Sequence, residues 1–399
     1  MGLMAHCSTL MGQLLQLIPR HVFDHLVDSH AWQGPNPRKF TYWSHLGAML
    51  FGQWSARKSL RDLVFSVNRQ VRKCYHLGLS VVKRSTLADA NQQRPAVIFE
   101  KTYYKLYERL SAELATQPQE APKIKIIDAT TIDLCASVFP WAKFRTRKGA
   151  IKLHTVLTEM LPQCVLVTDG KTHDRRAVQD LHFEPDDLLI FDRAYLDYAW
   201  LYQLHQGGVW FVTRLKTNSC YEVIQSRAAS GPVLADQIIR LSSPQGQTCY
   251  PEFLRRVHYR DPETGKEYVF LTNRLDLPAL EVAELYRRRW QIELFFKWIK
   301  QNLKIKAFYG TSKNAVLIQI WTALIAYLLL VWLKFKSKVG WGLLELSRLA
   351  QTMLLERLEL WAMLGLRPPD NRQPLLFNLR RQFQFFAGHG GVFLFSVGI

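Results

Sequence analysis

The sequence is poor in acidic residues and has no closely spaced cysteines. Asp and Glu number 33 against 52 Lys and Arg, which gives a formal net charge of +19. None of the six cysteines belongs to a C-x-x-C pair, which argues against a structural zinc site or a disulfide framework and favours free thiols in a reducing cytosol. The N-terminal stretch lacks a basic segment followed by a long apolar run, so we predict no secretory signal.

Internal repeats and low-complexity tracts are also missing. With 48% hydrophobic and 12% aromatic residues, the composition is that of a globular protein. The basic charge is spread along the chain and not gathered in a tail, which predicts a broad surface for a polyanion. Nucleic acid is the most frequent partner of such a surface, and an anionic membrane is the alternative.

One apolar segment tests this interpretation. Ala315 to Leu333 carries no charged residue and is long enough to span a bilayer. Gln319, Thr322 and Tyr327 interrupt it, and Lys residues flank both ends, so the charge asymmetry of a membrane span is missing. We therefore favour a buried helix of a large domain and predict no membrane partner.

Changes of pattern divide the chain into five predicted parts. Apolar residues at helical spacing fill residues 1–118, and a polar linker ends that part. Strand-like runs, later alternating with helical patterns, make 119–216 and 271–335 an α/β domain with a mixed sheet. Short β-like pieces with turn signals between them predict a β-rich insertion at 217–270. The remainder, 336–399, is predicted as a helical region with a tail to which we assign no role.

The stretch from Tyr286 to Lys300 has no Gly or Pro and is predicted to form one helix. At about 100° per residue, Tyr286, Arg289 and Lys300 all fall close to Glu293 on the helix surface. Taken alone, Glu293 is best explained by ordinary ion pairs with Arg289 and Lys297 on a solvated face. A single acid among cations is also found in metal-dependent phosphoryl-transfer sites. Whether Glu293 belongs to such a site depends on whether other acids lie near it.

Two aspartates supply that evidence. Asp128 and Asp192 each follow an apolar run predicted to be a buried strand, and ligands of open α/β sheets bind at this edge. Either Asp alone would be read as a turn former. Together with Glu293, they could hold two Mg²⁺ ions about 4 Å apart for phosphodiester chemistry, with Mn²⁺ able to substitute.

These residues carry a resemblance to a known family. The spacing of Tyr286, Arg289, Glu293 and Lys300 matches the Y-R-E-K signature of DDE transposases of the insertion-sequence-4 family, which the chain resembles over roughly residues 5 to 350. The segments around Asp128 (DATTIDL) and Asp192 (FDRAY) resemble that family as well. Ala194 stands where the family usually has Gly, which leaves the backbone geometry of that turn open.

The resemblance implies a fold, an activity and partners. It implies a ribonuclease-H-like catalytic domain with a β-rich insertion, and an N-terminal helical domain that binds the terminal inverted repeats of the element. It implies Mg²⁺-dependent cut-and-paste transposition, in which Asp128, Asp192 and Glu293 bind the metal and catalyse cleavage and strand transfer into target DNA. It also implies a homodimer in the synaptic complex, in a bacterial cytoplasm and in contact with the nucleoid.

The same resemblance assigns DNA contacts to individual residues. It places Tyr286, Arg289 and Lys300 on phosphates near the cleaved end. We add a set of neighbouring polar residues as predicted DNA contacts: Lys152, His154, Arg193 and Lys297. Relatives hold a flipped base with a Trp of the insertion, but no Trp lies between Val212 and Arg289, so this role is unassigned and Trp290 and Trp298 are predicted to be packing residues.

Two further functions stay open on the sequence. A ribonuclease-H-like nuclease without strand transfer would use the same three carboxylates. A DNA-binding remnant without catalysis is the other, because the tail has no explanation and Ala194 departs from the family pattern. The sequence does not give the inverted repeats, the target preference or the use of a hairpin intermediate.

Overall fold

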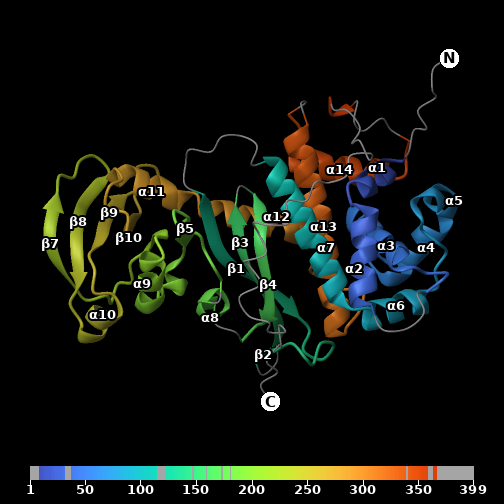
Figure 1. The fold of residues 1–399 in the computed structure, drawn as a ribbon, viewed down its shortest axis with the longest axis horizontal. Coiled ribbons are helices and arrows are strands. Elements are labelled where there is room, and N and C mark those ends of the chain that lie inside the picture. The colour runs from blue at the N-terminus through green and yellow to red at the C-terminus, as the bar shows by residue number, and fades with distance from the viewer. Residues whose placement is uncertain are drawn as a thin grey trace.

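The structure is a computed structural model that describes residues 9–31, 37–114, 123–145, 148–158, 160–171, 174–179, 181–337, 340–357 and 363–365. A long sheet runs through the molecule, with helices of the N-terminal and C-terminal parts gathered at one end of it and the strands of the 217–270 region at the other (Figure 1).

The N-terminal part is helical. Side-chain caps define some of its helix starts: Thr41 accepts from the backbone N–H of Ser44, and Ser59 accepts from that of Asp62. Buried apolar residues of these helices join one large core with the sheet. Its elements are α1 (Leu10–Gln16), α2 (Arg20–His30), α3 (Tyr42–Trp54), α4 (Leu60–Arg69), α5 (Val71–Cys74), η1 (Tyr75–Leu77), α6 (Arg84–Gln93) and α7 (Ala96–Leu114).

A 10-stranded mixed sheet forms the centre, in the order β2-β3-β1-β5-β6-β10-β9-β8-β7, with β4 paired to β3. Strands β1, β5 and β6 are parallel, and the other pairs are antiparallel. The strands are β1 (Ile124–Leu134), β2 (Lys143–Arg145), β3 (Lys148–Thr158), β4 (Leu161–Asp169), β5 (Leu188–Phe191), β6 (Trp210–Arg214), β7 (Tyr221–Arg227), β8 (Val233–Leu241), β9 (Leu254–Arg260) and β10 (Glu267–Thr272). This confirms the predicted α/β class with a mixed sheet.

The two faces of the sheet belong to different cores, because side chains alternate along a strand. Ile126 and Ile132 of β1 join the core shared with the N-terminal helices, whereas Ile127 joins a second core. That second core contains residues of α8 (Asp174–Gln179) and α9 (Tyr198–Gln206). The short helix η2 (Arg193–Tyr195) connects β5 to α9, and α10 (Pro244–Cys249) connects β8 to β9.

The strands of the 217–270 region do not form a separate layer. They extend the central sheet, since β10 pairs with β6 of the core on one side and with β9 on the other. The domain boundaries drawn from the sequence stay predictions. Of the part predicted at 336–399, the structure describes α14 (Leu343–Met353) and a few neighbouring residues, and the 383–399 tail lies outside the described residues.

The stretch from Tyr286 to Lys300 is not one helix, and this prediction was wrong. Helix α11 (Ala279–Arg287) ends before α12 (Trp290–Asn302) begins. The backbone N–H groups of Arg289, Gln291 and Ile292 each bond to the carbonyl three residues earlier, which tightens the chain at the junction. Tyr286 therefore belongs to α11 and Glu293 to α12, with Arg289 at the junction.

Helix α13 (Lys313–Lys336) contains the uncharged segment. Among the described residues it is the one helix long and apolar enough to cross a membrane, and 89% of its most apolar window is buried inside the protein. It packs against α7 and α3 and also touches β4 (Figure 1). Burial on all sides explains its composition, as predicted for a core helix.

Candidate active site

Asp128 and Asp192 lie on neighbouring parallel strands at the same level. Ile127 of β1 is paired with Phe191 of β5, and each is followed directly by an Asp. Ile127 and Phe191 both point into the second core. Because side chains alternate, Asp128 and Asp192 are directed toward the opposite face. Sheet pairing thus brings together two acids that are far apart in the sequence.

Helix α12 covers this face beside β1 and brings the third acid. Its buried residues Ile292, Phe295, Phe296 and Ile299 anchor it to the large core. Glu293 is half-buried at the edge of that apolar stripe. It lies close enough to Asp128 to raise the pKa of that carboxyl group, as does Asp192. The three predicted carboxylates therefore share one electrostatic neighbourhood.

Arg289 bridges two of these acids. Its guanidinium donates through Nη2 to Oε1 of Glu293 at 2.6 Å, and its Nη1 lies 3.4 Å from Oδ2 of Asp128. The side chain of Arg289 is only 16% exposed, and its partner Asp128 comes from a different element, β1. The contact is therefore more than a solvated ion pair within one helix, which the sequence alone had favoured.

Asp128 is the carboxyl group most strongly affected by this environment. Burial is the main reason that its pKa rises from 3.8 to about 6, and Glu293 and Asp192 raise it further. The backbone N–H of Ala129, 2.8 Å from Oδ1, and the charge of Arg289 oppose the rise. Buried acids that crowd one another are unfavourable as anions unless a cation neutralises them.

The donor set fits a hard divalent cation. Carboxylate oxygens are the ligands that Mg²⁺ and Mn²⁺ prefer, and a positive group already stands between Asp128 and Glu293 in the form of Arg289. Among the residues that the structure describes, no three Asp, Glu, His or Cys are grouped as a finished metal site. Metal binding at the three acids would therefore require Arg289 to separate from Asp128 and Glu293.

Lys300 and Tyr286 complete the polar surroundings. Nζ of Lys300 donates to Oγ1 of Thr130 at 2.6 Å and to the carbonyl of Thr131 at 2.8 Å. Thr130 was missed in the sequence, although it stands two residues after Asp128 and so on the same face of β1. The Tyr286 ring lies 5.0 Å from that of Phe270, and burial, then Asp192, raises its pKa to about 12 while Arg289 opposes the rise.

The other predicted contact residues lie elsewhere. Asp128 is paired with Thr155, so Lys152 and His154 of β3 belong to the opposite face of the sheet. His154 is buried and its Nε2 lies 2.9 Å from Oγ1 of Thr168. Arg193, just after Asp192, and Lys297 of α12 are both exposed. The DNA contacts assigned to these four residues stay predictions, and the sheet register does not favour the pair on β3.

The turn after Asp192 resolves the question raised by Ala194. This residue lies in η2, and the positive-φ residues other than Gly in the described chain do not include it. A side chain at this position is therefore compatible with the backbone. Trp290 was predicted to be a packing residue, but it is 57% exposed. Trp298 does pack, against Tyr327 with ring centroids 5.2 Å apart.

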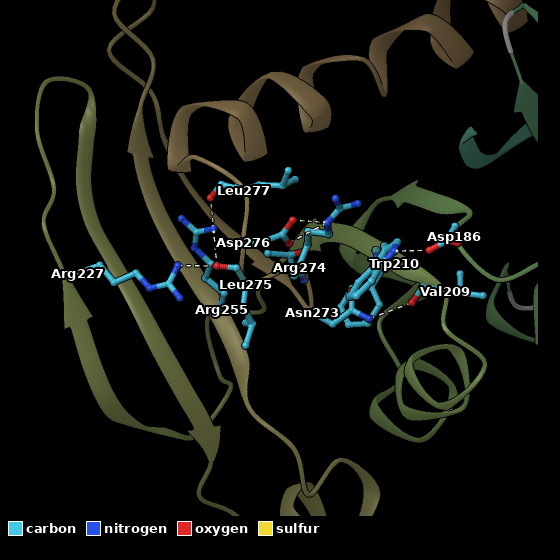
Figure 2. Close-up of polar contacts among 12 residues, drawn as sticks. Asp186, Val209, Trp210, Arg227, Arg255, Asn273, Arg274, Leu275, Asp276 and Leu277 are labelled. Carbon is cyan, nitrogen blue, oxygen red and sulfur yellow. Dashed lines mark hydrogen bonds and ion pairs between the residues drawn. The ribbon is translucent and has the colours of Figure 1, made fainter. Parts of the chain in front are cut away.

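A polar clamp fixes the segment that leads into α11. Arg255 is buried and donates to both oxygens of Asp236 at 2.8 Å. It also donates to the carbonyl of Leu277 (Figure 2). Arg227 donates to the carbonyl of Leu275 at 2.6 Å. The strands of the 217–270 region thereby hold the start of the helix that carries Tyr286.

Comparisons with known proteins agree with this arrangement. The family model described as a transposase DDE domain matches residues 119–329, which include Asp128, Asp192 and Glu293. A second model, described as a domain of unknown function (DUF4372), matches residues 6–80. The first match covers the strands β1 to β10 and the helices α11 and α12.

Several curated relatives are similar over most of their length. A putative transposase, y4zB, from Sinorhizobium fredii is 34% identical, covering 72% of this chain and 82% of the relative. A probable transposase for insertion sequence element IS5377 from Geobacillus stearothermophilus is 28% identical, covering 65% and 70%. A putative transposase for insertion sequence element IS4SA from Synechocystis is 24% identical, covering 73% and 83%.

The family match also identifies the fold and the class of chemistry. DDE transposase domains are ribonuclease-H-like, they act on DNA, and they use divalent metal ions to cleave DNA and transfer strands. The mixed sheet, in which the parallel strands β1 and β5 lead into two of the acids, agrees with that fold. The chain belongs to the DDE transposase family of insertion sequences.

Proposed function

We propose that Asp128, Asp192 and Glu293 are the metal-binding carboxylates of this transposase. The observation that carries the proposal is the parallel pairing of Ile127 with Phe191, which directs both aspartates toward the face where Glu293 lies. Mg²⁺ is the ion that we expect, with Mn²⁺ as a substitute, because the ligands are all hard oxygens. Two such ions would activate the attacking oxygen and stabilise the leaving one.

The neighbouring cations then serve to bind the DNA backbone. Arg289 offers a planar pair of donors that matches a phosphate, and Lys300 offers a point charge from the next turns of α12. Tyr286 stands beside Arg289, with the guanidinium carbon 5.7 Å from the ring centroid. We assign these three residues to phosphates near the cleaved end, and we extend the assignment to the exposed Arg193 and Lys297.

The N-terminal helices supply a surface for the ends of the element. Leu63, Val64 and Val67 of α4 point into the core, and a stripe of exposed residues lies on its other side. Phe65 is 60% exposed and lies under Arg69, whose guanidinium carbon is 5.3 Å from the ring centroid. The basic members of this stripe, called the α4 stripe, are Arg61 and Arg69 of α4, Lys58 just before the helix and Arg72 of α5 just after it. We propose that it binds the terminal inverted repeats.

Cut-and-paste transposition needs both ends of the element to be held together. We therefore propose that two copies of the chain pair the ends in a synaptic complex, as the family resemblance implies. The freed 3′-hydroxyl of each end would then attack target DNA, in a bacterial cytoplasm. A nuclease that stops after cleavage is the second candidate, since the same acids would serve it.

The experiment compares Asp128→Asn, Asp192→Asn and Glu293→Gln with wild type on a duplex that ends in the inverted repeat flanking the coding region. Each substitution should lower Mg²⁺-dependent cleavage by about 1,000-fold or more while binding of the duplex is kept. Glu284→Gln, an exposed acid on α11, is the matched control and should retain cleavage. Undiminished cleavage by any of the three variants would remove that residue from the site.

Strand transfer is tested separately with pre-cut ends. Wild-type protein should join the 3′-hydroxyl of such an end to a target plasmid, and the three carboxylate variants should not. Cleavage of the uncut end without any joining of the pre-cut end would favour the nuclease. Binding without either reaction would favour a DNA-binding remnant.

A further inference from the structure

Two of the cations assigned to DNA phosphate, Arg289 and Lys300, are already bound by other groups of the candidate active site. Arg289 lies on Asp128 and Glu293, and Lys300 lies on Thr130, two residues beyond Asp128 on β1. In the absence of DNA, the positive charge of Arg289 therefore neutralises the acids that metal would otherwise neutralise. The two tasks of the site, binding metal and binding phosphate, compete for the same groups.

We propose that Arg289 is an internal cation that occupies the carboxylates of Asp128 and Glu293 and so hinders metal binding. A DNA phosphate that binds the guanidinium would release these carboxylates. DNA-end binding and divalent-metal binding are then cooperative. The proposal rests on the function proposed above, because it takes Asp128 and Glu293 as metal ligands. It adds a regulatory role for Arg289 that precedes the reaction.

A metal ion and the guanidinium of Arg289 would compete for the same carboxylate oxygens. A metal ion bound to carboxylate oxygens would stand about 2 Å from each of them. Nη2 of Arg289 is already 2.6 Å from Oε1 of Glu293, and Nη1 is 3.4 Å from Oδ2 of Asp128. A guanidinium and a divalent ion this close would repel each other strongly in a partly buried site. One of them must leave before the other binds well.

Two buried donors indicate where Arg289 goes. Nε of Arg289 and the hydroxyl of Tyr286 are both buried, and neither has a hydrogen-bond partner among the described residues. Buried polar groups are normally satisfied, so these two groups at one helix junction can take an acceptor from outside the chain. A phosphate oxygen of DNA has the negative charge and the acceptor sites that both groups lack. A phosphate bound there would satisfy both groups and so favour the exchange.

The consequence is a reciprocal linkage. If DNA removes Arg289 from the acids, metal binds more tightly in the presence of a DNA end, and DNA binds more tightly in the presence of metal by the same factor. Couplings of this kind are typically about 5- to 150-fold. Free protein would then bind metal less tightly than protein with DNA in the site.

The test measures Mn²⁺ binding by electron paramagnetic resonance, with wild type, Arg289→Ala and Arg288→Ala, each with and without an excess of the pre-cut element-end duplex. Arg288 is the matched control, because it is exposed and next in the chain. Wild type should bind Mn²⁺ about 5-fold or more tightly with the duplex than without it. Without DNA, Arg289→Ala should bind Mn²⁺ more tightly than wild type by a similar factor, and Arg288→Ala should behave as wild type.

The outcomes separate this proposal from the assignment of the acids. If Arg289→Ala and the more conservative Arg289→Gln, both folded by circular dichroism, bind Mn²⁺ in the absence of DNA no better than wild type, the regulatory role of Arg289 is overturned. If Arg288→Ala tightens Mn²⁺ binding as much as Arg289→Ala, a general loss of charge explains the effect and the proposal also fails. If Asp128→Asn and Glu293→Gln leave Mn²⁺ binding unchanged with DNA present, the proposed metal site itself is wrong.

Discussion

Asp128 and Asp192 are aligned by a single pair of residues, Ile127 and Phe191, which face each other on adjacent parallel strands. The acids come directly after this pair, at the point where β5 ends and β1 continues. Strand pairing is rigid compared with loop geometry, so the distance between the two acids depends little on the connecting segments. Glu293 is held less firmly, because a helix and the guanidinium of Arg289 position it.

The raised pKa of Asp128, caused mainly by its burial, predicts an effect on stability. Its folded pKa of about 6 exceeds the ordinary value of 3.8, so its ionised form destabilises the metal-free protein above pH 6. This penalty disappears as the pH falls toward 4. Asp128→Asn should therefore raise the free energy of unfolding by about 1–3 kcal/mol at pH 7.5 and by much less at pH 4.5, measured by urea denaturation without metal.

The control for that measurement is Asp133→Asn. Asp133 is exposed on the same strand, and its substitution should change the free energy of unfolding by less than about 0.5 kcal/mol at either pH. An Asp128→Asn variant that is less stable than wild type at pH 7.5 would contradict the account. It would mean that Arg289 more than compensates the buried charge.

His45 predicts the opposite pH dependence. Its side chain is buried on α3 with Nε2 2.8 Å from Oδ1 of Asn91, and burial lowers its pKa from 6.5 to about 3. A lowered pKa means that stability is fully present above pH 6.5 and is lost as the pH falls below it, since only the unfolded chain takes up the proton. Relative to His45→Gln, wild type should lose about 1.4 kcal/mol per pH unit in this range.

Urea denaturation at pH 7.5, 6.0 and 5.0 measures this loss. His76→Gln, at an exposed position of η1, should follow wild type at each pH. Parallel pH profiles for wild type and His45→Gln would show that some other group controls the acid sensitivity.

The clamp of Arg255 predicts a large cost of truncation. Arg255→Met would leave Asp236 buried without its cation, which typically costs about 3–5 kcal/mol in the free energy of unfolding. Arg260→Met is the matched control: its ion pair with Glu267 is exposed, so the cost should stay below about 1 kcal/mol. Equal losses measured for the two variants would contradict a structural role of the clamp.

The α4 stripe predicts a salt-dependent loss of binding. Arg69→Ala should weaken binding of the element-end duplex severalfold and reduce the slope of log affinity against log salt by about 1, because one phosphate contact is lost. Lys101→Ala, at an exposed position of α7, removes the same charge elsewhere and should change neither quantity. Fluorescence anisotropy over a salt series measures both quantities. Equal effects of the two substitutions would show that the DNA does not bind at α4.

Much of the site follows from sequence pattern. Apolar runs followed by an acid predicted β1 and β5 as buried strands, although β1 continues past Asp128 to Leu134 and does not end there as predicted. The wheel position of Glu293 predicted its closeness to Arg289. These features are local, so propensity and periodicity capture them. The α/β class and the burial of the uncharged segment in α13 follow in the same way.

The rest depends on contacts between distant residues. The break between α11 and α12 has no Gly or Pro to mark it and comes from tightened hydrogen bonds at Arg289. The face on which His154 lies is set by the register of β3 on β1, which no local pattern specifies. Exposure of Trp290 likewise depends on what packs against α12 and not on the residue itself.

The most direct test of the account is anomalous diffraction from crystals of the protein with the pre-cut element end and Mn²⁺. We predict two Mn²⁺ ions about 4 Å apart, bound by oxygens of Asp128, Asp192 and Glu293, with Arg289 on a phosphate of the DNA. Manganese bound at other acids, with Arg289 still between Asp128 and Glu293, would contradict it.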